Sequence, residues 1–239
     1  IEQACWPAEL CASSADILRR IDLDNTGQWV VEMDGKVVAV VYSQRIADIE
    51  SLRNVTINDV PSLRDKNGPV VQLLGLNVLP EVQSLGLGDQ LLDLILMRSA
   101  LQGGVSKVAG ITRCLEFSGS SRDEFDRFVA ERTSDGRPTD PVMRFHHQHG
   151  ASFLGAVHGY RPKDAQNVGA GVLLYYDFSG PGTTGSKSPR DHLEAGSESV
   201  KASLEYALLT VLGDAKRINF SWTRSFKDVG VDSLGLLEP

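Results

Sequence analysis

The alternation of apolar and polar residues predicts a series of short strands and helices, followed by a stretch of different character. Apolar runs rich in β-branched residues, which are typical of strands, cover residues 28–33, 36–46, 69–79, 105–112, 152–158 and 171–178. Asp34-Gly35 joins the first two runs, and this dipeptide favours a tight hairpin turn. Apolar residues at helical spacing predict helices over 8–21 and 89–101.

Two further helices are predicted beyond residue 117. A polar segment at 118–139 contains a helical core, and Asp140-Pro141 begins the other helix. Aspartate is a favoured N-cap residue, and proline is favoured in the first helical turn. The second helix carries three histidines, which are His146, His147 and His149. The order of elements predicts an α/β fold in which helices flank a mixed, mostly antiparallel sheet.

The composition changes after Phe178. Residues 179–199 are rich in Gly, Ser, Pro and Thr, which is typical of a flexible linker. An amphipathic helix is predicted over 200–212, and the sequence Gly-Val-Asp-Ser-Leu follows at 230–234. We therefore expect a domain over 1–178, a linker over 179–199 and a separate segment over 200–239.

The composition and charge narrow the classes of partner. Hydrophobic residues make up 41% of the chain and charged residues 23%, which is ordinary for a soluble globular protein. The net charge of −7 argues against a nucleic-acid partner, and no apolar run approaches the length of a membrane span. The first residues lack the basic and apolar regions of a secretory signal. We expect a cytoplasmic protein. Because the sequence does not begin with Met, we also expect it to be a piece of a longer chain.

The three cysteines do not suggest a metal or disulfide framework. Cys5, Cys11 and Cys114 are odd in number and lack metal-ligand spacing. We expect reduced thiols and no metal site.

A glycine-containing loop at 82–88 lies between a predicted strand and a predicted helix. Gly86 and Gly88 let the backbone approach a bound group, and Asp89 can cap the helix. Free N–H groups at such a helix start favour the binding of an anion, and a diphosphate is the expected ligand. The spacing matches neither the dinucleotide-binding nor the P-loop pattern. An ordinary turn that uses glycines for packing is the alternative interpretation.

Two patterns in this chain resemble known families. Gln83-x-x-Gly86-x-Gly88 resembles the acyl-CoA pyrophosphate loop of the GNAT acetyltransferase superfamily. The tail resembles the first half of an acyl carrier protein, whose Asp-Ser-Leu signature would place phosphopantetheine on Ser233. Simple capping of a helix by Asp232 or Ser233 is the alternative for the tail.

A GNAT-like domain followed by a carrier protein resembles the GNAT-like loading domains of polyketide synthases. The resemblance implies a GNAT acyltransferase fold, coenzyme A as the acyl donor, an acyl carrier protein in cis as partner and a larger multidomain synthase. It implies a catalytic pair, Thr112 and His146, and substrate contacts from Trp6 and Arg161. It further implies that the CoA site includes Val78, Gln83, Leu85, Gly86, Leu87 and Gly88.

The residues of the implied pair suit the decarboxylation of a malonyl thioester. Loss of CO₂ leaves an enolate, which needs hydrogen-bond donors at its oxygen and a proton source, and histidine can titrate near neutral pH. No metal is required. The acetyl group then passes to the carrier thiol. The sequence leaves open whether malonyl is held on CoA or on the carrier. Structural roles for the histidines, and pairing of Arg161 with Asp164, are the alternatives.

Two other functions are consistent with the sequence. An amine N-acetyltransferase that uses acetyl-CoA would need an acidic base or a water chain, and often a tyrosine acid. Tyr160 could be such an acid or a core aromatic residue, and no acidic residue sits in an obvious place. A non-catalytic scaffold that binds acyl-CoA and docks the carrier is the other alternative.

Overall fold

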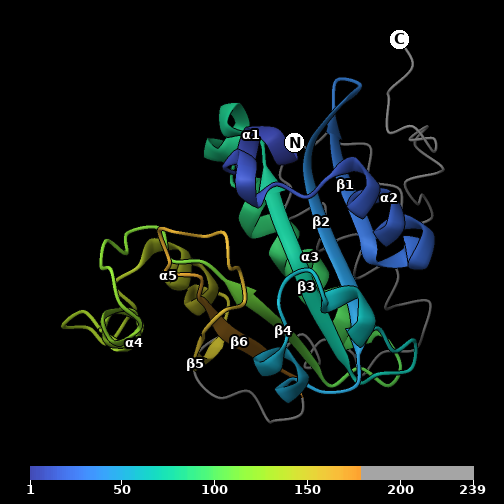
Figure 1. Ribbon diagram of the computed structural model, residues 1–239. Coiled ribbons are helices and arrows are strands. Elements are labelled where there is room, and N and C mark those ends of the chain that lie inside the picture. Colours follow the sequence, from blue (N-terminus) through green and yellow to red (C-terminus); the bar gives the residue numbers. More distant parts are fainter. Residues whose placement is uncertain (179–239) are drawn as a thin grey trace.

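Six strands form one mixed sheet in the order β1-β2-β3-β4-β6-β5 (Figure 1). The computed structural model describes residues 1–178, so Ser233 and the expected carrier segment lie outside the described residues. The strands are β1 Gln28–Met33, β2 Lys36–Ile46, β3 Val70–Val78, β4 Lys107–Thr112, β5 Ser152–Val157 and β6 Gly171–Asp177. Only β3 and β4 pair in parallel, which confirms the predicted mostly antiparallel sheet.

The β1–β2 hairpin forms as predicted. Asp34 and Gly35 have φ angles of 51° and 76°. Two successive positive φ angles are what a hairpin turn that follows the strand twist requires.

The helices begin at residues that local capping selects. They are α1 Glu2–Cys5, α2 Ser14–Leu23, α3 Leu87–Leu101, α4 Arg122–Ala130 and α5 Pro141–Gln148. The helix predicted over 8–21 is wrong in its start, because Ser13 and Asp16 form a capping box and α2 begins only at Ser14. The cap predicted at Asp89 is also wrong, because α3 begins at Leu87 and Gly86 precedes it without any side-chain cap. No helix in residues 1–178 is long and apolar enough to cross a membrane.

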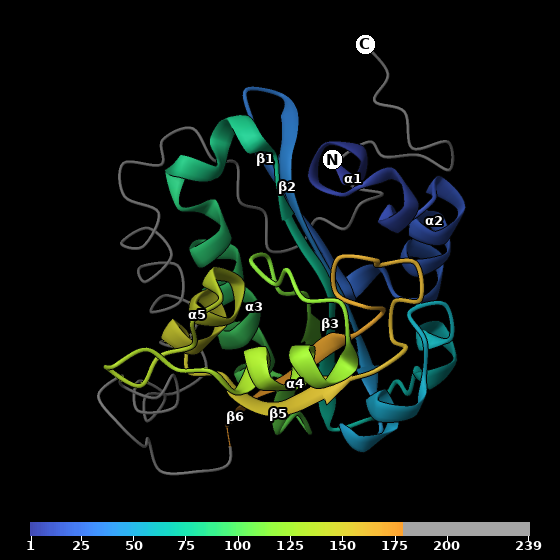
Figure 2. The same ribbon diagram turned by 60° about the vertical axis from the view of Figure 1, so that its left-hand side comes forward.

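Helices and short 3-10 turns cover the two faces of the sheet (Figure 2). Leu92 and Ile95 of α3 pack with Val71 and Val108 on one face. On the other face, Ile21 of α2 packs against β2, and the turns at Glu50–Asn54 and Val60–Leu63 add a second cluster. The sheet is therefore buried on both sides.

The pairing between β3 and β4 stops partway along the strands. The two strands are in register only from Val70 opposite Lys107 to Leu73 opposite Gly110. Beyond that point β3 still pairs with β2 as far as Val78, and β4 still pairs with β6 as far as Thr112. Each half of the sheet therefore continues without the other, and the two halves diverge (Figure 1).

The buried carboxylate of Asp140 joins the end of β4 to the start of α5. One oxygen accepts the backbone N–H groups of Val142 and Met143, at 2.9 and 3.1 Å. The other accepts those of Leu115 and Glu116, at 2.7 and 3.0 Å. Asp140 is fully buried, and its predicted role as the helix cap is confirmed. The same side chain fixes the segment after Thr112 relative to the helix that carries His146.

We expect Asp140→Asn to lower the free energy of unfolding by about 2–3 kcal/mol. The amide cannot accept all four N–H groups, and a buried donor without an acceptor costs about 1–3 kcal/mol. Urea denaturation measures the effect. Asp22→Asn, at an exposed position of α2, is the matched control and should change stability by less than about 0.5 kcal/mol. Equal stability of the two variants would contradict this role of Asp140.

Candidate active site

A cavity of about 410 Å³ opens where β3 and β4 diverge. Its walls come from the N-terminal segment, both diverging strands, α5 and the loop after β5. Six residues that the sequence singled out line it together, namely Trp6, Val78, Gln83, Thr112, His146 and Arg161. Residues 85–88 do not line it and lie beside it, at the start of α3. The described structure therefore gathers both proposed catalytic residues and both proposed substrate-binding residues around one space.

The turn before α3 presents backbone amides that no side chain caps. Gly86 has a φ of 69°, a conformation that favours glycine, and it precedes the first helical residue. Gln83 braces the turn, since its amide donates to the Val78 carbonyl at 3.1 Å. The side chain of Leu87 is buried in the core, and that of Leu85 is 51% exposed. The arrangement suits an anion on the helix amides.

His146 has a partly buried imidazole, and it lines the cavity. Its Nδ1 lies 2.8 Å from the hydroxyl of Tyr176. Its other ring nitrogen, Nε2, has no hydrogen-bond partner within residues 1–178 and is not fully buried. Burial, together with the charge of His149, lowers the pKa of His146 to about 4. The ring is therefore neutral at pH 7, unlike the expected histidine that titrates near neutral pH.

Thr112 is the last residue of β4, and its hydroxyl has only a weak partner. Within the described residues this hydroxyl makes one hydrogen bond, a long contact of 3.4 Å to the carbonyl of Arg113. The hydroxyl can therefore bind a ligand oxygen without breaking a strong contact.

Arg161 is a buried cation without an ion-pair partner among residues 1–178. It is 8% exposed, its Nε has no hydrogen-bond acceptor, and its guanidinium lies 5.0 Å from the centre of the Trp6 ring. The alternative of a surface pair with Asp164 is wrong, since Asp164 binds Arg113 at 2.7 and 3.0 Å. Burial lowers the pKa of Arg161 from its usual range. An unpaired buried guanidinium attracts an anionic ligand.

Trp6 is held by two polar residues that the sequence analysis did not identify. Its indole N–H donates to the side-chain oxygen of Asn77, at 2.8 Å. The Asn77 amide donates in turn to the carboxylate of Glu2, which also accepts the N–H of Ala12 at 3.3 Å. The sequence contained one signal for these contacts. Asn77 lies within the apolar run of β3, and a polar side chain in a buried strand needs a hydrogen-bond partner.

The other histidines of this helix serve its packing or face solvent. The ring nitrogens of His149 lie 2.8 Å from Asp93 and 3.0 Å from Asp89, both on α3. These contacts join α5 to α3, and they raise the pKa of His149. His147 is exposed. The described part of the chain contains no group of ligands suited to a metal ion, and Cys5, Cys11 and Cys114 are free thiols.

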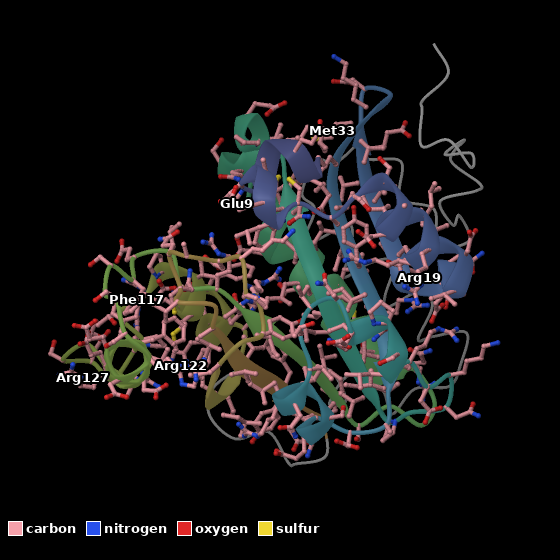
Figure 3. The ribbon with its side chains drawn as sticks, in the orientation of Figure 1. Glu9, Arg19, Met33, Phe117, Arg122 and Arg127 are labelled. Atoms are coloured by element: carbon pink, nitrogen blue, oxygen red, sulfur yellow. The ribbon has the colours of Figure 1, made fainter. Side chains whose placement is uncertain are left out.

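A second cavity of about 530 Å³ adjoins the first. The two share five lining residues, which are Trp6, Leu74, Gly75, Asn77 and Arg161. The second cavity extends towards α2, and Glu9 and Arg19, labelled in Figure 3, lie along it. Space therefore reaches the Trp6–Arg161 pair from two directions.

Comparisons with known proteins agree with this geometry. The model of the acetyltransferase (GNAT) family matches residues 1–115. The crystal structure of the loading GNATL domain of CurA from Lyngbya majuscula is 40% identical, with a TM-score of 0.71, over 74% of this chain and 88% of that one. The GphF GNAT-like decarboxylase, in complex with isobutyryl-CoA, is 38% identical, with a TM-score of 0.68, over 74% of this chain and 90% of that one. No curated protein sequence gives a significant match.

We expect substitution of Gly88 to weaken CoA binding without unfolding the domain. A Cβ at Gly88 would meet Phe145 and Val78 at 3.9 and 4.0 Å, which is ordinary contact, so the free protein accepts alanine. A diphosphate on the amides would lose its close approach. Calorimetry should show CoA affinity about tenfold lower for Gly88→Ala and lower still for Gly88→Val. Gly103→Ala, with open space around its Cβ, is the control. Unchanged affinity in both Gly88 variants would remove this turn from the CoA site.

We expect His146 to make the protein less stable as the pH falls from neutral. The unfolded chain binds a proton at this residue near pH 6.5, whereas the folded chain does so near pH 4. The unfolded state therefore holds more protons in this window, and the free energy of unfolding decreases by about 2 kcal/mol by pH 5. Denaturation of the wild type and of His146→Gln at pH 7 and pH 5 isolates the effect. An identical pH dependence in both proteins would contradict the lowered pKa.

Proposed function

This chain belongs to the GNAT acetyltransferase family, and on that premise we propose that it starts polyketide synthesis by decarboxylating a malonyl thioester. The acetyl group would then pass to the phosphopantetheine thiol of a carrier protein. One observation carries the proposal: Thr112, His146 and Arg161 line a single cavity that has no carboxylate among its lining residues. The likeness to a loading domain and to a decarboxylase supports the same function.

The substrate is proposed to extend from the start of α3 into the cavity. The CoA diphosphate would rest on the amides of residues 85–88, and the pantetheine arm would pass Gln83 and Val78. Along this path β3 still pairs with β2, but its edge towards β4 has no partner strand beyond Leu73 in the described structure, so the backbone groups on that edge can bind the amides of the arm. The acyl group would then reach Thr112 and His146.

Decarboxylation needs a donor at the thioester oxygen. The bond between the α-carbon and the carboxylate breaks, and CO₂ leaves. The electron pair of the broken bond stays with the α-carbon and forms an enolate, whose oxygen becomes negative. A neutral imidazole can donate its N–H to that oxygen, and the Thr112 hydroxyl can donate as well. The carbon then takes up one proton from solvent, directly or relayed through the Thr112 hydroxyl, which regains its proton from solvent, and this gives the acetyl thioester. We propose that His146 acts as this neutral donor, because its low pKa leaves no charged acid at pH 7.

Arg161 is proposed to bind an anionic part of the substrate. Its unpaired charge stands where the two cavities share residues, beside Trp6. A phosphate or the polar pantetheine arm fits this place. Tight pairing with the departing carboxylate would stabilise the ground state and slow the reaction, so we assign Arg161 to binding and not to the bond that breaks.

Transfer to a carrier needs access for a second pantetheine arm. The larger cavity provides a separate approach to Trp6 and Arg161, and the linker expected at 179–199 would keep a tethered thiol at high effective concentration. The exchange of one thioester for another is nearly isoenergetic, so positioning suffices. These features support a carrier in cis, with Ser233 as the proposed attachment site.

The amine N-acetyltransferase alternative lacks a carboxylate base in the cavity that contains His146. The buried carboxylate of Glu2 lines the larger cavity and not the one with His146. Its two oxygens already accept hydrogen bonds from Asn77 and Ala12. A carboxylate occupied in this way holds Trp6 in place and is poorly disposed to take a proton from an amine.

Incubation with malonyl-CoA, followed by mass spectrometry, tests the proposal. We expect loss of CO₂ and formation of acetyl-CoA, with the rate reduced about 10²–10³-fold by His146→Ala or by Thr112→Val, the usual cost of removing one such donor. His147→Ala, at an exposed neighbouring position, should retain the wild-type rate. Binding without turnover would favour the scaffold alternative. Acetylation of an added amine without decarboxylation would favour the acetyltransferase.

A second arm of the experiment tests the carrier. In a chain extended through a complete carrier, a phosphopantetheinyl transferase should modify Ser233, and malonyl-CoA should then yield acetyl-carrier. Modification of a different serine would overturn the carrier assignment. Modification of Ser233 without acetyl-carrier, from malonyl-CoA or from malonyl-carrier, would overturn the transfer step and leave the decarboxylase proposal standing.

A further inference from the structure

Tyr176 on β6 provides the hydroxyl that contacts the His146 ring. The two atoms, Tyr176 Oη and His146 Nδ1, are 2.8 Å apart. Tyr176 is 3% exposed and belongs to the core cluster that also contains Leu92 and Ile95 of α3. Its strand pairs with β4, where Tyr176 lies opposite Val108. The core therefore fixes the position of this hydroxyl, with or without a ligand.

The protons on this pair can be arranged in two ways. In the first, the tyrosine donates to Nδ1, and the neutral imidazole carries its own proton on Nε2. In the second, Nδ1 donates to the tyrosine, and the hydroxyl proton needs another acceptor. Within residues 1–178 the Tyr176 hydroxyl has no other hydrogen-bond partner, so the second arrangement leaves a buried donor unsatisfied. Burial raises the pKa of Tyr176, so the hydroxyl keeps its proton.

We propose that Tyr176 is a positioning residue that donates to His146 Nδ1 and thereby holds the ring as the Nε2–H tautomer. Nε2 is the ring nitrogen without a hydrogen-bond partner in residues 1–178, it is not fully buried, and His146 lines the cavity. The cavity then meets a hydrogen-bond donor instead of a lone pair. The tautomer itself does not depend on the proposed function; only its consequence for the rate rests on that function.

The consequence for catalysis follows from the sign of the interaction. An N–H at Nε2 attracts the oxygen of a thioester, more strongly as that oxygen becomes an enolate. A lone pair at Nε2 repels the same oxygen. Removal of the Tyr176 hydroxyl would release Nδ1, and both tautomers of the neutral ring would be populated. A fraction of the enzyme molecules would then present the lone pair of Nε2, instead of its N–H, to the substrate.

Nitrogen NMR of the chain with ¹⁵N-labelled histidine measures the tautomer without substrate. The protein has five histidines, and the two nitrogen signals that are lost in His146→Gln identify the ring of His146. We expect a protonated Nε2 and an unprotonated Nδ1 in the wild type at pH 7, and a shift towards protonated Nδ1 in Tyr176→Phe. A wild-type ring with its proton on Nδ1 would overturn the inference even if the variant did not fold. An unchanged tautomer in a folded Tyr176→Phe would overturn it as well.

Decarboxylation kinetics provide the second readout. We expect Tyr176→Phe to lower kcat about tenfold or more with little change in KM, the range seen when the outer partner of a functional histidine is lost. Tyr175→Phe makes the same change on the same strand, at a hydroxyl that does not contact His146, and should keep the wild-type kcat. A changed tautomer with an unchanged rate would overturn the positioning role. A wild type that does not decarboxylate malonyl-CoA would instead refute the proposed function, and the spectra would still decide the tautomer.

Discussion

The early end of pairing between β3 and β4 is the constraint on which the site depends. A parallel pair that continued to Val78 and Thr112 would bring the strands within about 4.8 Å of each other and leave no room for a substrate. Because pairing stops at Leu73 and Gly110, the two halves of the sheet separate and a cavity of about 410 Å³ opens between them. The unpaired backbone groups of the strands are the cost of that space, and a bound pantetheine arm can satisfy them.

Buried polar contacts fix the segments on each side of this opening. Asp140 joins the segment after β4 to α5, and Glu2 and Asn77 join the N-terminal segment to β3. Asp164 binds Arg113 beside the site. Burial alone would raise the pKa of this carboxyl, but Arg113 and the hydrogen bonds from Asn167 outweigh it, so the pKa is lowered. Satisfied buried networks of this kind specify one geometry. Arg161 and the Nε2 of His146 differ, because residues 1–178 provide no ion-pair partner for the arginine and no hydrogen-bond partner for the Nε2 atom.

The sequence predicted what local patterns control. The hairpin at Asp34-Gly35, the strands and the cap at Asp140 depend on neighbouring residues, and they are confirmed. The start of α2 could also have been predicted, because Ser13 and Asp16 have capping-box spacing. Contacts between distant residues could not: Asp89 lies within the first turn of α3 and binds His149, which is 60 positions away. The low pKa of His146 and its contact with Tyr176 depend on packing that no local pattern encodes. The candidate site residues were predicted from the resemblance to GNAT-like loading domains, and the periodicity of apolar residues does not identify them.

A crystal structure of this protein with acetyl-CoA bound tests the central claim most directly. We expect the thioester to lie between the diverging strands, with its oxygen within about 3.2 Å of His146 Nε2 or of the Thr112 hydroxyl. We expect the diphosphate at the start of α3. A thioester bound in the larger cavity beside Glu2, or an oxygen out of reach of both His146 and Thr112, would contradict the account.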